Sequence, residues 1–114
     1  MQIDKAMSNS DTSEPQDAEH VFERAAELFG LLSSPLRLRI VSELCRSELN
    51  VGQLLERIDT TQPNMSQHLA VLYRAGVVAR RREGSQMHYR IGSVGAAAVC
   101  RSVCVDIAIQ DGGA

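Results

Sequence analysis

Residues 50–76, NVGQLLERIDTTQPNMSQHLAVLYRAG, hold two amphipathic segments that are separated by a short polar break. Asn50 is a preferred helix cap, since its side chain can accept a hydrogen bond from an amide of the first turn. Residues 59–61 interrupt the apolar periodicity, Pro63 suits the first turn of the next helix, and Gly76 favours its end. The stretch therefore predicts two helices joined by a tight turn, which is a helix-turn-helix.

The sequence on either side of this stretch predicts three more helices and a hairpin. Helical spacing of apolar residues predicts helices at 15–33 and 35–46. Strands are expected at 77–82 and 86–91 around a turn that contains glycine, and a last helix from 94 to about 109. The predicted class is mainly α with a β-hairpin wing, in the order ααααββα, which is a winged helix-turn-helix.

Length and composition favour one globular domain. The chain has 114 residues, of which 44% are hydrophobic and 23% are charged. We expect an acidic, disordered leader at 1–14, a single domain at 15–110 and a short tail at 111–114. No apolar run reaches the roughly 18–20 residues of a membrane helix, and the N-terminus lacks the apolar core of a secretory signal. A cytoplasmic protein with no membrane partner is therefore expected.

Charge is distributed unevenly along the chain, although the formal net charge is only −2. Residues 1–30 hold seven acids and two bases, which gives −5, whereas residues 31–110 hold ten arginines and six acids, which gives +4. Arginine matches the geometry of phosphate better than lysine does. The basic domain is therefore compatible with a nucleic-acid partner despite the overall acidity.

The polar face of the second helix in the opening stretch carries side chains that can read base edges. Met65, Leu69 and Leu72 cluster on one side of a helix, so polar residues such as Gln67 point away from them. Glutamine and asparagine can pair with adenine, and serine can donate or accept a hydrogen bond. The residues of this helix that we expect to contact DNA are Gln62, Asn64, Ser66, Gln67 and Arg74. The alternative is a solvated polar face on an ordinary helix.

The hairpin adds positive charge beside the helix-turn-helix. Arg80, Arg81 and Arg82 are consecutive near its turn, and Gln86 begins the returning strand. A basic β-ribbon can lie along the DNA backbone or in the minor groove, so Arg81, Arg82 and Gln86 are expected DNA contacts. The alternative is a hairpin whose charges only prevent edge-to-edge aggregation.

Three cysteines, Cys45, Cys100 and Cys104, are the remaining candidates for chemistry. Their odd number and the lack of a CxxC pair argue against a disulfide framework, which leaves buried apolar residues, metal ligands or reactive thiols. Cys100 and Cys104 share a helical face with Cβ atoms about 5–6 Å apart, beyond the ~3.5–4.5 Å of a disulfide. A bridge would therefore join Cys45 to one of the other two.

Four consecutive motifs resemble the ArsR/SmtB family of bacterial repressors. They are LLSSPLRLRI at 31–40, LNVGQL at 49–54, QPNMSQHLAVL at 62–72, and GVV, RREG and HYR between 76 and 90. The resemblance covers about residues 20–108 and implies a homodimer formed by the first and last helices. It also implies operator binding in the absence of ligand and release by an inducer, with Gln62, Ser66 and Gln67 as readers of bases and phosphates.

Comparison with the family's known sensor sites restricts the range of possible inducers, because this chain lacks several of those sites. The positions of the family's arsenic and cadmium cluster are Asn50, Gly52 and Leu55, and none of them is a metal ligand. The zinc sensors' last-helix site is missing as well, because that part of the chain has no histidine and its acids are Asp106 and Asp111. No resident metal and no cofactor is therefore expected.

The cysteines resemble the branch of the family that senses persulfides, polysulfides or thiosulfate with one cysteine in the second helix and one in the last. Ser42 holds that branch's usual second-helix position, Cys45 lies one turn later, and Cys104 lies one turn earlier than the last-helix position. Because the two cysteines are shifted by one turn in opposite directions along the chain, their thiols would still meet. We therefore expect release from DNA when Cys45 and either Cys104 or Cys100 react with an oxidised or reactive sulfur species, in control of sulfur-oxidation genes.

Three alternatives stay open from the sequence. Cys45, Cys100 and Cys104 supply three thiolates that suit trivalent arsenic or antimony, as in a soft-metal sensor. A thiol enzyme is disfavoured, because no nucleophile, base and orienting group can be placed together, so the chain is not expected to be an enzyme. A helix-turn-helix adaptor that dimerises without binding DNA would explain the net acidity but not the arginines of the hairpin.

Overall fold

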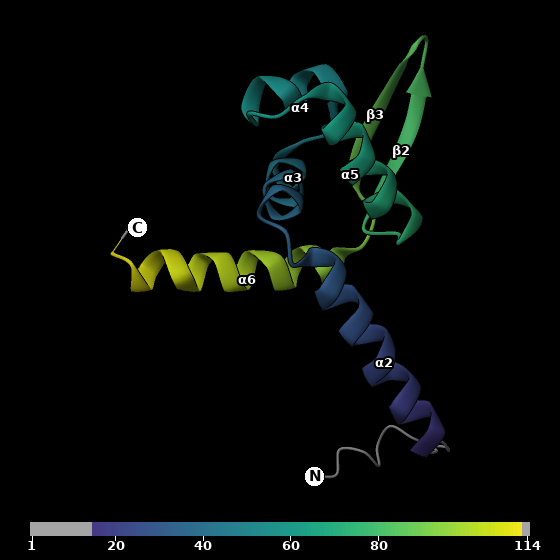
Figure 1. The fold of residues 1–114 in the computed structure, drawn as a ribbon, viewed down its shortest axis with the longest axis vertical. Helices are drawn as coiled ribbons and strands as arrows, with labels where there is room; N and C mark the ends of the chain where they lie inside the picture. Colours follow the sequence, from purple (N-terminus) through teal and green to yellow (C-terminus); the bar gives the residue numbers. More distant parts are fainter. Residues whose placement is uncertain (1–14, 113–114) are drawn as a thin grey trace. The chain divides into compact units, whose positions relative to one another are not determined.

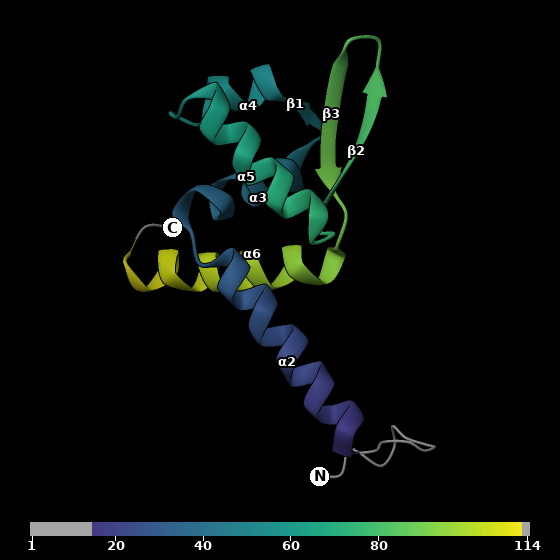
Figure 2. The ribbon, with the colours of Figure 1, turned by 45° about the vertical axis from the view of Figure 1, so that its right-hand side comes forward.

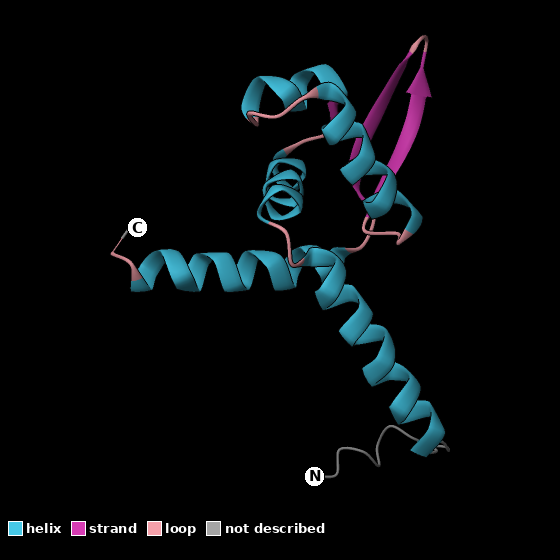
Figure 3. Ribbon diagram, in the orientation of Figure 1, coloured by secondary structure: helices cyan, strands magenta, loops and turns pink. Residues whose placement is uncertain are grey.

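The computed structural model describes residues 15–112, and Figures 1 and 3 show its helices and hairpin. The elements are α2 (Pro15–Leu32), α3 (Pro35–Arg46), β1 (Leu49–Asn50), α4 (Val51–Arg57), α5 (Gln62–Arg74), β2 (Val78–Glu83), β3 (Gln86–Ile91) and α6 (Val94–Gln110). All five expected helices and both strands of the hairpin are present, so the predicted mainly α class with a β-hairpin wing is confirmed. The leader expected at 1–14 lies outside the described residues.

The chain divides into two compact units between Leu31 and Leu32. The first unit contains nearly all of α2, whose side chains from Ala18 to Gly30 are mostly exposed. The second unit contains α3 to α6 and the hairpin, and it holds the core. None of the helices within residues 15–112 is long and apolar enough to cross a membrane.

Short polar side chains set where the helices of the second unit begin. The Oγ atom of Ser34 accepts a hydrogen bond from an amide of the first turn of α3 at 3.3 Å, and that of Ser93 accepts one from an amide of α6 at 3.1 Å. Asn50 Oδ1 accepts from the amide of Gln53 at 2.8 Å, while the Gln53 side chain accepts from the amide of Asn50 at 2.9 Å, which forms a capping box. Thr61 caps α5 in the same way as the serines. Because these signals are local, the helix starts at 35, 51, 62 and 94 agree with the sequence-based expectation.

The strand β1 corrects the expected order of elements, which is ααβααββα rather than ααααββα. Its two residues pair antiparallel with β3, with Leu49 opposite Tyr89 and Asn50 opposite His88, so the sheet is three-stranded in the order β1-β3-β2. Two residues are too short to show a strand periodicity, and their pairing is with a segment far along the chain. This pairing places the start of α4 directly beside the hairpin.

The apolar stripe of α5 forms the centre of the core. Met65, Leu69 and Leu72 are fully buried, as the helical spacing predicted. The surrounding core residues come from the end of α2, from α3, the β1–α4 region, the base of the hairpin and the first turns of α6. They are Leu32, Ile40, Val41, Leu44, Leu49, Leu54, Ile58, Val77, Val78, Tyr89, Ala96, Ala97 and Cys100. Figures 1 and 2 show the hairpin beside α5, with its turn at the end away from α6. The core therefore fixes α5 and the base of the hairpin together.

The end of α5 matches the stop signal in the sequence. Gly76 has a φ of 81°, a left-handed conformation that favours glycine. The amide of Gly76 donates to the carbonyl of Tyr73, and the amide of Val77 donates to that of Leu72, each at 3.0 Å. This pair of bonds is a Schellman motif, which closes the helix and turns the chain directly into β2.

The junction between β3 and α6 is tightly packed around Gly92. Its amide donates to the carbonyl of Val77 at 2.8 Å, which draws the two chain segments together. A Cβ atom on Gly92 would lie 3.0 Å from the carbonyl oxygen of Gly76 and 3.0 Å from the backbone carbon of Val78. Because backbone atoms cannot rotate away as a flexible side chain can, only glycine fits here without a shift of the hairpin base.

We predict that Gly92→Ala destabilises the protein by about 1–3 kcal/mol, because the methyl group overpacks the junction against backbone. Gly95→Ala is the matched control, since a Cβ at Gly95 in the first turns of α6 meets nothing within 4 Å. That variant should be neutral or more stable by up to about 1 kcal/mol, because alanine has the higher helix propensity. Urea unfolding followed by circular dichroism measures both. Equal stability of the two variants would contradict the packing argument.

Candidate nucleic-acid interface

The face of α5 opposite the core presents the polar residues that the sequence singled out. They are exposed, and they are Gln62, Asn64, Ser66, Gln67 and Arg74. Within residues 15–112, no side-chain hydrogen bond or ion pair engages Gln62, Ser66, Gln67 or Arg74. The buried stripe holds the helix rigidly while these donors and acceptors stay available, which is the arrangement that readout in a major groove requires.

Asn64 differs from its neighbours because its side chain is already engaged. Its Nδ2 atom donates to the Oγ1 atom of Thr60 at 2.9 Å, and its backbone amide donates to the Oγ1 atom of Thr61 at 3.2 Å. The residue therefore stabilises the turn between α4 and α5. Bidentate pairing with adenine would require this amide group to leave Thr60 or to use its second hydrogen.

A second contact fixes the middle of α5 against α3. The Nε atom of Arg37 donates to Nδ1 of His68 at 3.0 Å, so the imidazole accepts and is held in its neutral form. Burial lowers the pKa of His68, and the positive charge of Arg37 lowers it further. Sequence reasoning missed this residue, because a lone histidine beside an apolar stripe carries no spacing signal. Its role here is to orient the helix that bears Gln67.

The three consecutive arginines of β2 have three different surroundings. The Cζ atom of Arg80 lies 3.9 Å from the centroid of the Tyr73 ring, so this guanidinium stacks on the end of α5. Arg81 forms ion pairs with Glu48 at 2.8 Å and with Glu83 at 3.1 Å. Arg82 is exposed and has no ion pair or side-chain hydrogen bond in the described part of the chain. The hairpin is therefore less uniformly basic than a count of its arginines indicates.

Gln86 links the hairpin to the helix-turn-helix. Its Oε1 atom accepts a hydrogen bond from Nδ2 of Asn50 at 2.7 Å, while Asn50 also caps α4. One asparagine thus connects the start of α4 to the start of β3, in agreement with the pairing of β1. The expected DNA contact at Gln86 stays a prediction, and its structural contact is with Asn50.

The three cysteines lie on two helices that pack against each other, α3 and α6. Cys45 is half-buried on α3, Cys100 is buried on α6, and Cys104 is exposed on α6; all three are free thiols. Burial raises the pKa of Cys100, and the neighbouring Cys104 and Cys45 raise it further. Within residues 15–112, no group of three His, Cys, Asp or Glu side chains is arranged to hold a metal ion.

An exposed polar helix held by a buried stripe, beside a hairpin, defines a winged helix-turn-helix DNA-binding protein. The family described as "Bacterial regulatory protein, arsR family" matches residues 34–80. The biofilm growth-associated repressor of Xylella fastidiosa is 34% identical over 96 residues, which are 84% of this chain and 84% of that protein. The chain therefore belongs to the ArsR family of bacterial regulatory proteins, and it is a DNA-binding transcriptional regulator, not an enzyme.

Solved structures of relatives have the same fold. Reduced HlyU from Vibrio cholerae superposes with a TM-score of 0.71 at 33% identity, covering 77% of this chain and 93% of that one. A homodimeric winged helix-turn-helix DNA-binding domain from Mycobacterium bovis gives a TM-score of 0.70 at 26% identity, covering 86% of this chain and 89% of that one. The winged-helix class inferred from the sequence is confirmed.

We predict that Gln67→Ala weakens binding to operator DNA by about 1–3 kcal/mol and changes binding to random DNA much less. The reason is that a contact to a base edge carries sequence information, whereas contacts to phosphate do not. Fluorescence anisotropy on both duplexes at one salt concentration gives the two affinities, and unfolding of the variant checks its stability. Equal losses on the two duplexes would remove Gln67 from the readers of sequence.

Proposed function

We propose that this protein is a transcriptional repressor that binds double-stranded operator DNA as a homodimer and leaves it when its thiols react with a reactive sulfur species. The observation that carries the proposal is the placement of the free thiols of Cys45, Cys100 and Cys104 on α3 and α6, while α3 also contacts the DNA-facing helix α5. We propose sulfur-oxidation genes as its targets. Residues 15–110 would act as one domain for DNA binding and dimerisation.

On DNA, α5 is proposed to enter the major groove with its first turns towards the bases. Gln62, Ser66 and Gln67 lie in those turns, and the N-terminal residues of a recognition helix are the ones that reach base edges. Arg74 at the end of α5 and Arg82 on the hairpin would meet phosphates on either side. A dimer would place two such helices about 34 Å apart, one turn of the duplex.

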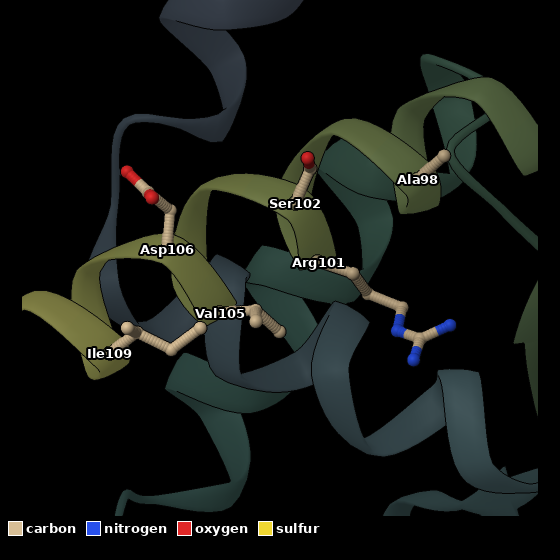
Figure 4. A pocket seen from close by; sticks show the side chains of 6 residues that line it. All are labelled: Ala98, Arg101, Ser102, Val105, Asp106 and Ile109. Atoms are coloured by element: carbon tan, nitrogen blue, oxygen red, sulfur yellow. The ribbon is translucent and has the colours of Figure 1, made fainter. Parts of the chain in front are cut away.

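The proposed dimer interface centres on the exposed face of α6. Figure 4 shows two adjacent rows of side chains on this helix, and the space that they line has a volume of about 520 Å³. One row is Ala98, Ser102 and Asp106, and the other is Arg101, Val105 and Ile109. Val105 is 53% exposed and Ile109 is 65% exposed, which is unfavourable for apolar side chains that meet only water.

A second copy of this chain is the occupant that the charges on this face favour. In a two-fold interface the same patch faces itself, so Arg101 of one copy can meet Asp106 of the other when the helices run antiparallel. Val21, Phe22 and Phe29 of α2 are exposed apolar residues as well, in keeping with a dimer that uses the first and last helices. The related domain from Mycobacterium bovis, described as homodimeric, supports the same assignment.

We predict that Val105→Asp weakens the dimer by about 10- to 100-fold, because each copy would lose an apolar contact and bury a carboxylate in its place. Operator binding should weaken with it, since two half-sites would no longer be held by one particle. Val105→Leu keeps the apolar surface and should remain dimeric. Light scattering after size exclusion, across a dilution series, measures the mass. If the Val105→Asp protein stays dimeric down to the same concentration as the wild type, this face is excluded as the interface.

The proposed reaction forms a bridge between α3 and α6. The thiolate of Cys45 or Cys104 attacks the terminal sulfur of a persulfide, R–S–SH, giving a cysteine persulfide and R–S⁻. A second cysteine thiolate then attacks the inner sulfur, which forms the S–S bond and releases HS⁻. The two cysteines lose two electrons, and the sulfane sulfur gains them. Cys100 is the weakest first nucleophile, since burial raises its pKa and keeps it as a thiol.

We predict that Cys45→Ser binds operator DNA within about twofold of the wild type but is no longer released by a persulfide donor, since no bond between α3 and α6 can form. Fluorescence anisotropy follows the release of the wild-type protein from operator DNA, starting from its reduced form. It also follows the reversal of that release by a reductant. Cys100→Ser and Cys104→Ser, treated identically, show which α6 cysteine completes the bridge. Normal release of Cys45→Ser would remove Cys45 from the sensor.

Arsenite provides the comparison with the soft-metal alternative. Three thiolates on α3 and α6 would suit trivalent arsenic or antimony, but no three-ligand group is preformed in residues 15–112. Release by arsenite alone, lost on substitution of any one of Cys45, Cys100 and Cys104, would favour that alternative. Release by the persulfide donor with only two cysteines required supports the sulfur sensor.

A further inference from the structure

The outer face of the hairpin carries a cluster of paired charges that DNA binding does not explain. In the register of β2 and β3, Ala79 lies opposite Arg90, Arg81 opposite His88, and Glu83 opposite Gln86. Residues directly opposite each other in an antiparallel pair project to the same side of the sheet. Arg81, Glu83, His88 and Arg90 therefore share one face, and Glu48 reaches it from the segment before β1.

Arg81 uses two edges of its guanidinium within the protein. Its Nε atom donates to Glu48 Oε2 at 3.1 Å and its Nη2 atom donates to Glu48 Oε1 at 2.8 Å, which is the two-point pairing of arginine with a carboxylate. Its Nη1 atom donates to Glu83 Oε1 at 3.1 Å. Arginine can also bind a phosphate through its Nε and Nη2 atoms, so Glu48 occupies the position where a DNA phosphate would bind.

Glu48 is held in place by its chain neighbours. Leu49 is 2% exposed and pairs with Tyr89, and Asn50 pairs with His88 while it caps α4. The carboxylate itself remains ionised, since the hydrogen bond from Arg81 lowers the pKa of Glu48, with further help from the charges of Arg81, His88 and Arg90. A fixed anion therefore faces the cationic side chains of the hairpin.

We propose that Glu48 lowers the affinity of the protein for DNA of any sequence by occupying the phosphate-binding edge of Arg81, which keeps the hairpin from adding sequence-independent affinity. Electrostatic attraction to phosphate supplies essentially all non-specific binding, and each further neutralised phosphate strengthens it on all sequences alike. With Arg81 paired, the hairpin offers Arg82 to the backbone and leaves discrimination to the bases read by α5.

The deciding variant is Glu48→Gln, which removes the charge and keeps the size of the side chain. We expect random-sequence duplex DNA to be bound about 3- to 10-fold more tightly, because Arg81 becomes available to phosphate. The slope of log affinity against log salt should steepen by about 0.9 for each additional phosphate that the protein neutralises. Affinity for operator DNA should rise by a similar factor, because a contact to phosphate carries no sequence information.

Matched variants separate this effect from a general change in charge. Glu56→Gln removes one negative charge from an exposed position on α4 that has no ion pair in the described chain, and it should change both affinities by less than about twofold. Arg81→Gln removes the side chain that is proposed to bind phosphate. In that background Glu48→Gln should add no affinity and no salt slope, because no guanidinium is left at position 81 for the loss of Glu48 to free.

Three results would overturn the proposal. An increase that is the same for Glu48→Gln and Glu56→Gln, or that persists without Arg81, would assign the effect to net charge alone. Weaker binding to both duplexes by a folded Glu48→Gln protein would mean that Glu48 positions Arg81 on phosphate instead of withholding it. Glu83→Gln is the second test, because Glu83 is exposed at the hairpin turn and its loss need not disturb the fold. It should raise random-DNA affinity in the same direction by a smaller factor, and only when Arg81 is present.

Discussion

The burial of Met65, Leu69 and Leu72 is the constraint on which the rest of the structure depends. These side chains are fully buried, so α5 can present only its opposite face to a partner. The Schellman turn at Gly76 then leads directly from α5 into β2, which fixes the hairpin relative to the helix. The hydrogen bond from Arg37 to His68 and the stacking of Arg80 on Tyr73 add orientation to this packing. These contacts therefore fix the position of the hairpin relative to α5.

The features that the sequence predicted are those with local causes. Caps such as Ser34, Asn50 and Ser93, and the helical spacing of apolar residues, act within a few residues and so predicted all helix starts in the second unit. The strand β1 and the pairing of Glu48 with Arg81 depend on contacts more than thirty residues apart along the chain, and no spacing in the sequence signals them. The pairing of Glu83 with Arg81 was not predicted either, because the expected strand ended at residue 82, whereas β2 continues through Glu83 and so puts both side chains on one face.

The arginines of β2 show how surroundings decide what an identical side chain can do. Counted in the sequence, Arg80, Arg81 and Arg82 are three equivalent positive charges. In the fold, one stacks on an aromatic ring, one is paired with two carboxylates and one is unpaired within the described residues. Charge density along a sequence therefore gives an upper limit on the phosphates that a hairpin can neutralise. The acids that reduce this number come from elsewhere in the chain, as Glu48 does.

The position of α3 explains how a reaction at thiols could reach DNA in the proposed mechanism. This helix contacts both α5, which is proposed to face DNA, and α6, which carries Cys100 and Cys104. A bond from Cys45 to α6 would therefore act on the helix that supports α5 through Arg37 and His68. A coupling of about 1–3 kcal/mol is enough for a 5- to 150-fold change in affinity, so a small shift of α3 suffices. Such coupling is reciprocal, and a dimer bound to operator DNA must then disfavour the bridged form by the same factor.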